Sequence, residues 1–160
     1  MHVEVTVADY AKPQHAAAIV HLLDQYARDP MGGSKGLSEP VKEILVAELA
    51  KRPTAFSVLA FVDRSAAGLA NCFEVFSTFA AEPVVNIHDI AVLPDYRGMG
   101  LSQTLLQKVE EVARKRGCCK LTLEVLEGNA PARRAYEKFG FGGYRLDPDT
   151  GEALFWQKPL

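Results

Sequence analysis

The chain has 160 residues, of which 48% are hydrophobic and 24% charged, a composition typical of one globular domain with a sizeable core. Its formal net charge of −2 argues against nucleic acid as a partner, because a nucleic-acid surface needs a basic footprint. The apolar runs are too short to span a membrane, and residues 1–10 lack the pattern of a secretory signal. We therefore expect a cytoplasmic protein with residues 1–160 in a single domain and no membrane partner.

The first third of the chain predicts one strand and two helices. Alternation over residues 3–7 indicates a strand, and apolar spacing over residues 14–26 indicates a helix. Residues 30–36 are rich in glycine and form a loop, of the kind that contacts substrates or simply connects two helices. Ser38 is a suitable N-cap for a second helix that ends near Lys51.

The middle third predicts three strands. Residues 56–62 and 69–76 are rich in apolar side chains, and residues 63–68 between them predict a hairpin connection. Residues 84–92 predict a further strand, which ends before Pro94.

The last third predicts two helices and three strands. The first helix has regular apolar spacing, and Asn129 is a suitable N-cap for the second. The two final strands flank a turn and predict a second hairpin. In chain order the elements are a helix at 102–116, a strand at 120–126, a helix from Asn129 to 138, and strands at 141–146 and 153–157.

The element order β-α-α-β-β-β-α-β-α-β-β predicts a mixed α/β fold. A central mixed sheet of about seven strands would be flanked by about four helices. A strand–helix–strand crossover, which makes two strands parallel, is expected only around residues 84–126.

A glycine-rich loop, residues 96–102, stands between a predicted strand and a predicted helix. Gly98 and Gly100 let the backbone approach a ligand closely, and the first turn of a helix offers unpaired N–H groups to phosphate oxygens. Arg97 adds a charged donor. The loop lacks the Gly-Lys-Ser/Thr of a P-loop, and Gln103 stands where a dinucleotide fingerprint has its third glycine. A phosphate cradle and a plain tight turn both fit these residues.

The pattern Arg97-x-x-Gly100-x-Ser102 resembles motif A of the GNAT acyl-CoA N-acyltransferases, which have Gly or Ala at the last position. The spacing from Asn129 to Tyr136 is similar to a second motif of that family. Further matches are Gly68, residues 89–96 and Phe139-Gly140-Phe141.

This resemblance implies a single-domain GNAT fold that uses acetyl-CoA as a co-substrate and no metal. The pyrophosphate would lie on the glycine-rich loop, and the pantetheine arm would pair with the strand before it. A backbone N–H near Ala91 or Val92 would stabilise the oxyanion of the tetrahedral intermediate. The implied cofactor-binding residues are Ile90, Ala91, Val92, Arg97, Gly98, Met99, Gly100, Leu101, Ser102, Gln103 and Asn129.

The resemblance also implies catalytic residues. Tyr136 matches the family tyrosine that protonates the departing thiolate, although its place on an apolar helical stripe also fits simple packing. Residues 76–79 are similar to an aromatic-Ser-Thr-aromatic string of diamine acetyltransferases, which continue with Glu-Asp. Here His88 replaces that glutamate and is a candidate base. Glu74 is a second candidate base, and Asp89 would bind a substrate cation or orient a partner.

The sequence thus predicts an N-acetyltransferase that acts on a primary amine of a small molecule, such as a polyamine, an amino acid or an aminoglycoside-like compound. A protein-lysine acetyltransferase and a catalytically silent acyl-CoA-binding module are the alternatives. Residues 154–156 suit an edge strand at a homodimer interface or an ordinary core strand. The odd number and spacing of Cys72, Cys118 and Cys119 fit neither a disulfide framework nor a metal site.

Overall fold

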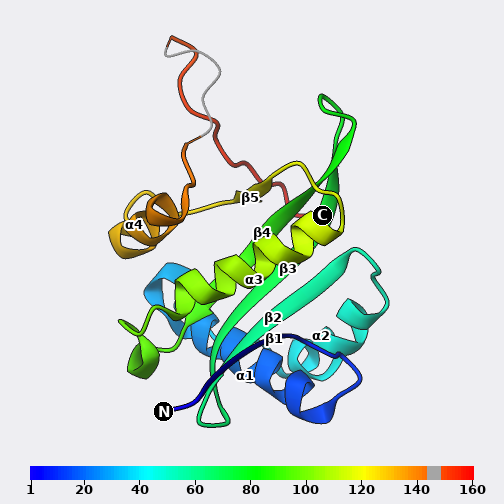
Figure 1. Cartoon of the computed structure of the whole chain (residues 1–160), viewed down its shortest axis with the longest axis vertical. Coiled ribbons are helices and arrows are strands. Elements are labelled where there is room, and N and C mark those ends of the chain that lie inside the picture. Colours follow the sequence, from blue (N-terminus) through cyan, green and yellow to red (C-terminus); the bar gives the residue numbers. More distant parts are fainter. Residues whose placement is uncertain (144–148) are drawn as a thin grey trace.

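The structure is a computed structural model that describes residues 1–143 and 149–160 (Figure 1). Up to Phe139 its elements follow the predicted order, and the two short 3-10 turns η1 (Pro30–Gly32) and η2 (Pro94–Tyr96) are additions. The elements are β1 (Val3–Val7), α1 (Pro13–Arg28), α2 (Glu39–Ala50), β2 (Ala55–Val62), β3 (Ser65–Ser77), β4 (Glu82–Val92), α3 (Leu101–Lys115), β5 (Leu121–Leu123) and α4 (Ala130–Phe139).

The sheet has the strand order β1-β2-β3-β4-β5. Strands β1 to β4 pair antiparallel, and β5 lies parallel to β4 after the crossover through α3. The predicted mixed α/β fold with four helices is therefore confirmed, and the parallel pair falls where the crossover was expected.

Helices cover both faces of the sheet (Figure 1). Leu105, Leu106 and Val109 of α3 are fully buried against one face. Ile19 and Leu22 of α1 are buried against the opposite face, where α2 adds Leu49. The 3.6-residue apolar spacing of these helices is what lets each of them bury one side against the strands.

The number of strands was predicted wrongly. The described residues form a five-stranded sheet rather than one of about seven strands. The predicted strand 153–157 does not form, and Leu154, Phe155 and Trp156 are 74% to 83% exposed. A strand needs a partner for its N–H and C=O groups, and β5 offers an edge of only three residues. The predicted strand 141–146 extends into residues outside the described ranges.

The hairpin between β2 and β3 is tighter than predicted. The expected six-residue connection is a two-residue turn at Asp63 and Arg64, both with positive φ. Gly68 therefore lies within β3, where a Cβ would meet the side chain of Leu105 at 3.1 Å and the carbonyl oxygen of Ala91 at 3.2 Å. This glycine lets α3 pack closely on the sheet.

A β-bulge interrupts the pairing of β3 with β4. Asn71 pairs with Asp89 and Cys72 pairs with Ile87, so His88 is an extra residue on β4. The pairing of β5 with β4 covers only Val85–Ile87 and stops at the bulge. Past this point the two strands part, which is why the predicted strand 120–126 is shortened to three residues.

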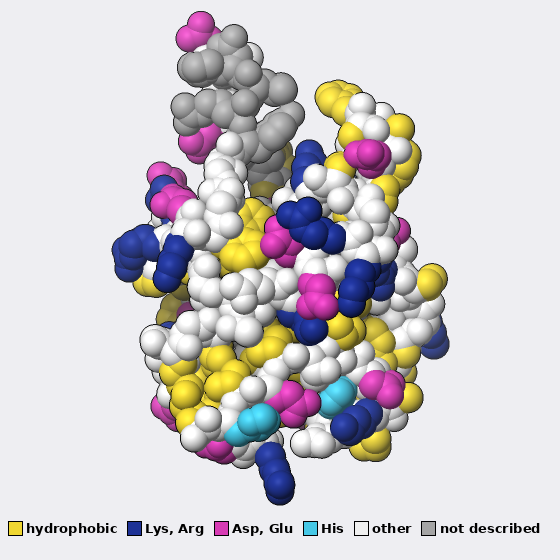
Figure 2. All heavy atoms as spheres, in the orientation of Figure 1, with side chains coloured by type: hydrophobic (Ala, Val, Ile, Leu, Met, Phe, Trp, Pro, Cys, Tyr) yellow, Lys and Arg dark blue, Asp and Glu magenta, His cyan; other side chains and the backbone are white. Residues whose placement is uncertain are grey.

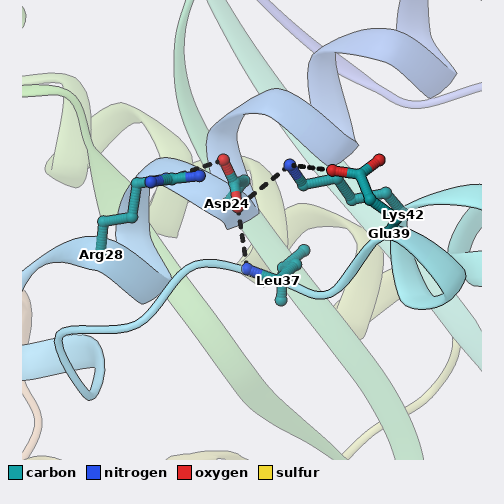
Figure 3. A network of polar contacts seen from close by, with 5 residues as sticks. All are labelled: Asp24, Arg28, Leu37, Glu39 and Lys42. Carbon is teal, nitrogen blue, oxygen red and sulfur yellow. Dashed lines mark hydrogen bonds and ion pairs between the residues drawn. The ribbon is translucent and has the colours of Figure 1, made fainter.

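A buried carboxylate fastens the segment between α1 and α2 (Figure 3). Asp24 is 8% exposed; one of its oxygens accepts a hydrogen bond from Arg28 Nε at 3.0 Å and the other from the Leu37 backbone N–H at 2.8 Å. Lys42 of α2 lies 3.7 Å from the same carboxylate. Arg28 beside it holds the pKa of Asp24 below its ordinary value.

Asp24→Asn should lower the melting temperature by a few degrees at neutral pH, because the amide loses the charge that Arg28 and Lys42 face. Since the folded pKa is depressed, the stabilisation is present above the unfolded pKa and is lost as pH falls through the folded one. The difference between variant and wild type should therefore shrink below pH about 4. Glu39→Gln, whose carboxylate is 80% exposed beside Lys42, is the control and should change little. An Asp24→Asn difference that persists at low pH would contradict this.

No helix among the described residues is both long and apolar enough to cross a bilayer. The tip of the β3–β4 hairpin projects from the body and carries apolar side chains (Figure 2). Phe76 and Phe79 there are 63% and 97% exposed. The 76–79 string that is similar to diamine acetyltransferases thus lies on a protruding tip.

Candidate active site

The parting of β4 and β5 opens onto a cavity of about 730 Å³. Five parts of the chain line it: the end of β4, the glycine-rich loop with the start of α3, the start of α4 with the segment before it, the end of α1 with η1, and Phe155 of the C-terminal segment. Residues of these parts include His88, Ile90, Ala91, Val92, Arg97, Gly98, Gly100, Leu101, Ser102, Glu124, Asn129, Ala135, Tyr136, Tyr26, Asp29 and Met31.

The glycine-rich loop presents bare backbone to this cavity. Gly98 and Gly100 have φ of 79° and 78°, the left-handed region that glycine adopts without strain. A Cβ at either glycine would meet no described atom within 4 Å. Gly100 directly precedes α3, and its carbonyl accepts the first helical hydrogen bond, from Thr104 N–H at 3.2 Å. The N–H groups before Thr104 are therefore available to an anion.

The side chains of the loop hold that backbone in place. Leu101 is 3% exposed in a small apolar cluster, and Met99 packs against it. Gln103 Nε2 donates to the carbonyl of Ala135 at 2.8 Å, which ties α3 to α4. The predicted contacts of Met99, Leu101 and Gln103 with a phosphate thus depend on their backbone, because the side chains of Met99 and Leu101 pack together and that of Gln103 is hydrogen-bonded to α4.

Arg97 and Asn129 lie at the cavity with partners of their own. Arg97 Nε donates to the Val92 carbonyl at 3.1 Å, and its Nη2 lies 3.5 Å from an oxygen of Asp29. The Asn129 side-chain oxygen accepts from the Ala132 N–H at 3.3 Å and caps α4. The amide nitrogen of Asn129 remains as a donor for a ligand.

The backbone of β4 presents alternate residues to the open edge. Leu93 N–H donates to the Ala67 carbonyl on the β3 side at 2.9 Å. Backbone groups alternate along an antiparallel ladder, so Ala91 also points its N–H and C=O toward β3. Ile90 and Val92 point theirs the other way, toward the gap. Of the two predicted oxyanion donors, the Val92 N–H faces the cavity and the Ala91 N–H does not.

Two half-buried phenols lie at the cavity. Burial raises the pKa of Tyr136 to about 12, and its ring meets Phe141 edge-on at 6.1 Å. Tyr26, on the last turn of α1, lines the same cavity; burial, followed by the negative charges of Asp89 and Asp29, raises its pKa. From the sequence, Tyr26 is only the last residue of the predicted helix 14–26. Neither spacing nor motif marks it as a cavity residue.

The three predicted polar residues for the acceptor end are placed differently. His88 is exposed at the bulge, lines the cavity and meets the ring of Phe73 edge-on at 5.6 Å. Asp89, half-buried, is not part of the cavity lining and accepts from Asn71 Nδ2 at 3.1 Å. Glu74 lies outside the cavity lining, 3.4 Å from Arg116 at the end of α3. The structure thus brings His88 and Tyr136 to one cavity and leaves Glu74 elsewhere, in an ion pair.

The cysteines and metal-ligand residues show no further centre. All three cysteines are free thiols, and burial raises the pKa of Cys72, which keeps that thiol protonated. Over the described ranges, no three His, Cys, Asp or Glu side chains gather as metal ligands would.

Solved structures share this fold. The bisubstrate-analogue complex of AAC(6')-Iy superposes with a TM-score of 0.79, at 19% identity, over 100% of both chains. Ribosomal-protein-alanine N-acetyltransferase from Brucella melitensis biovar Abortus 2308 superposes with a TM-score of 0.74, at 18% identity, over 91% of this chain and 96% of that one. The chain therefore has the same fold as these two structures.

The acetyltransferase (GNAT) family model matches residues 16–141, and the chain belongs to this family. Streptothricin acetyltransferase of Streptomyces lavendulae is 40% identical over 75 residues, which are 47% of this chain and 40% of that protein. Thialysine N-epsilon-acetyltransferase of Mus musculus is 38% identical over 66 residues, which are 41% and 38% of the two chains. The matched segments thus span less than half of the length of these relatives.

Proposed function

We propose that this chain is an acetyl-CoA-dependent N-acetyltransferase that transfers the acetyl group to a primary amine of a small molecule by direct attack in a ternary complex. The observation that carries the proposal is one cavity that joins an anion cradle, an open strand edge and a half-buried phenol. The family membership and the acetyltransferase relatives support the same reaction.

The cavity residues fit acetyl-CoA. Gly98 and Gly100 leave space against the backbone for the pyrophosphate, next to the first-turn N–H groups of α3 and the guanidinium of Arg97. The open edge at Ile90 and Val92 would pair with the amides of the pantetheine arm. The bound thioester supplies an electrophilic carbonyl carbon.

The reaction needs a proton acceptor, an oxyanion donor and a proton donor. The amine must lose a proton before its nitrogen attacks the thioester carbonyl, and His88 at the bulge is the candidate base. The Val92 N–H on the open edge is the candidate oxyanion donor. As the C–S bond breaks, the thiolate takes a proton from Tyr136, whose raised pKa keeps the phenol protonated at neutral pH.

Carboxylates at and beside the cavity favour a cationic amine. Asp29, which pairs with Arg97, and Glu124 line the cavity, and Asp89, next to the lining residue His88, lies close enough to Tyr26 to raise the pKa of that phenol. Carboxylates attract the ammonium form in which amines exist at neutral pH. Streptothricin and thialysine, after which two of the related acetyltransferases are named, are both amines.

A thiol-release assay with acetyl-CoA tests the proposal. The amines are streptothricin, thialysine, the aminoglycoside sisomicin and a peptide with an N-terminal alanine, chosen from the relatives and solved structures. A lysine peptide tests the protein-lysine alternative. We expect release of coenzyme A with at least one small amine and slower release with both peptides. Acetyl-CoA that raises the melting temperature without any thiol release would instead favour the silent binding module.

A further inference from the structure

A chain of partly buried hydrogen bonds crosses the sheet and ends at Asp89, which lies between the cavity-lining residues His88 and Ile90 on β4. The hydroxyls of Tyr10, which precedes α1, and Ser57 on β2 are 2.9 Å apart. Ser57 Oγ lies 2.6 Å from Asn71 Oδ1 on β3, and Asn71 Nδ2 lies 3.1 Å from Asp89 Oδ2 on β4. Four segments that are distant in sequence therefore contribute one polar side chain each.

The chemistry of the groups fixes the direction of every bond in this chain. A carboxylate only accepts hydrogen bonds, so Asn71 must donate from Nδ2 to Asp89, and its Oδ1 must face Ser57. Ser57 must then donate its single proton to that Oδ1. The remaining proton, between Tyr10 and Ser57, must come from Tyr10, and burial raises the pKa of this phenol, so it stays protonated. All the donors point toward Asp89.

These hydrogen-bonded side chains lie where apolar packing would be expected. Ser57 is 0% and Asn71 is 3% exposed, on the sheet face that otherwise buries apolar side chains such as Leu59 and Leu69. Apolar residues at both sites would fill the same face without any need for hydrogen bonds. The polar pair gains its use from Asp89, because within the described residues that carboxylate has no other hydrogen-bond donor.

We propose that Asn71 is a positioning residue that fixes the Asp89 carboxylate for the ammonium group of the acceptor, with Ser57 and Tyr10 holding the Asn71 amide in one orientation. The inference rests on the proposed function, since it assigns a use to the acceptor end of that same site. One oxygen of Asp89 is held by Asn71, and the other stays available to the substrate.

The test compares Asn71→Leu and Ser57→Ala with a matched control, Asn86→Leu. Asn86 also joins two strands of this sheet, donating from Nδ2 to Thr122 Oγ1 at 3.0 Å, but lies outside the chain. With the panel amine that the wild type acetylates fastest, Asn71→Leu should raise the KM for the amine about tenfold and Ser57→Ala about threefold. The KM for acetyl-CoA and the acetyl-CoA thermal shift should stay as in the wild type, and Asn86→Leu should leave both KM values unchanged.

A second comparison separates positioning from structural support. In an Asp89→Asn background, Asn71→Leu should add less than a twofold change, because the group that it orients is already altered. Ser57→Ala alone leaves the amide oxygen of Asn71 without its donor. The double variant Ser57→Ala/Asn71→Leu removes that amide, so it should be more stable than Ser57→Ala without regaining the wild-type KM for the amine. If the wild type turns over and Asn71→Leu keeps the wild-type KM for the amine, this inference alone is overturned. Ser57→Ala takes the place of Asn71→Leu in this comparison if the latter does not fold. If the wild type shows no turnover, the proposed function is overturned as well.

Discussion

Gly100→Glu should abolish the rise in melting temperature that acetyl-CoA gives the wild type, and should weaken binding at least about 100-fold. A Cβ at Gly100 opens onto free space beside the first turn of α3, where the pyrophosphate is proposed to lie. The new carboxylate would occupy that space and repel the phosphates. Thermal shift with millimolar acetyl-CoA, followed by calorimetry, measures the loss.

Gly117→Glu is the matched control for this change. Gly117 follows the other end of α3 and has φ of 72°, so a side chain there carries the same left-handed strain. Its Cβ would also meet no described atom within 4 Å. Both variants should therefore lose similar stability without ligand, but only Gly117→Glu should keep the acetyl-CoA shift. A retained shift in Gly100→Glu would place the phosphates elsewhere.

Tyr136→Phe should lower kcat about 100-fold while the KM for acetyl-CoA stays within about twofold, because only the proton donor for the thiolate is removed. Since burial raises the pKa of this phenol to about 12, wild-type kcat should not fall as pH rises through 10, where an ordinary tyrosine ionises. Steady-state thiol release across pH measures both effects.

Tyr26→Phe tests whether Tyr136, and not Tyr26, is the proton donor for the thiolate. Tyr26 lines the same cavity and also has a raised pKa, so it is the other phenol able to protonate a thiolate. We expect Tyr26→Phe to change kcat less than Tyr136→Phe. A larger fall in Tyr26→Phe would transfer the role of the acid to that residue.

Local sequence signals predicted the helices and their order well. The predicted helix 102–116 is found at Leu101–Lys115, and the helix after Asn129 ends at Phe139, before the left-handed Gly140. These boundaries depend on apolar periodicity and capping residues, which act over a few positions. The glycine-rich loop at a helix start was predictable for the same reason.

Features that depend on distant pairing were beyond such signals. The shortness of β5 follows from the point at which β4 leaves it, and no residue of 120–126 carries that information. From the sequence, Glu74 is a candidate base. In the folded protein its carboxylate lies beside Arg116, which is 42 positions away in the chain. Ser57 and Asn71 stand in apolar strands, and only the sheet register makes them neighbours. Tyr26 lines the cavity from α1, which packs on the face of the sheet opposite to α4, and local sequence signals do not show this arrangement.

The extra residue at His88 reverses the phase of β4. Before it, Val85 and Ile87 face α3; after it, Ile90 and Val92 do so, and Asp89 and Leu93 face α1. An uninterrupted two-residue alternation would instead turn the carboxylate of Asp89 into the apolar layer under α3. Deleting His88 would remove the imidazole and the bulge together, and would leave a regular strand in which Asp89 still faces α1 and Ile90 still faces α3. With one extra residue, the same strand places Val85 and Ile87 against α3 before the bulge and the carboxylate of Asp89 on the α1 side after it.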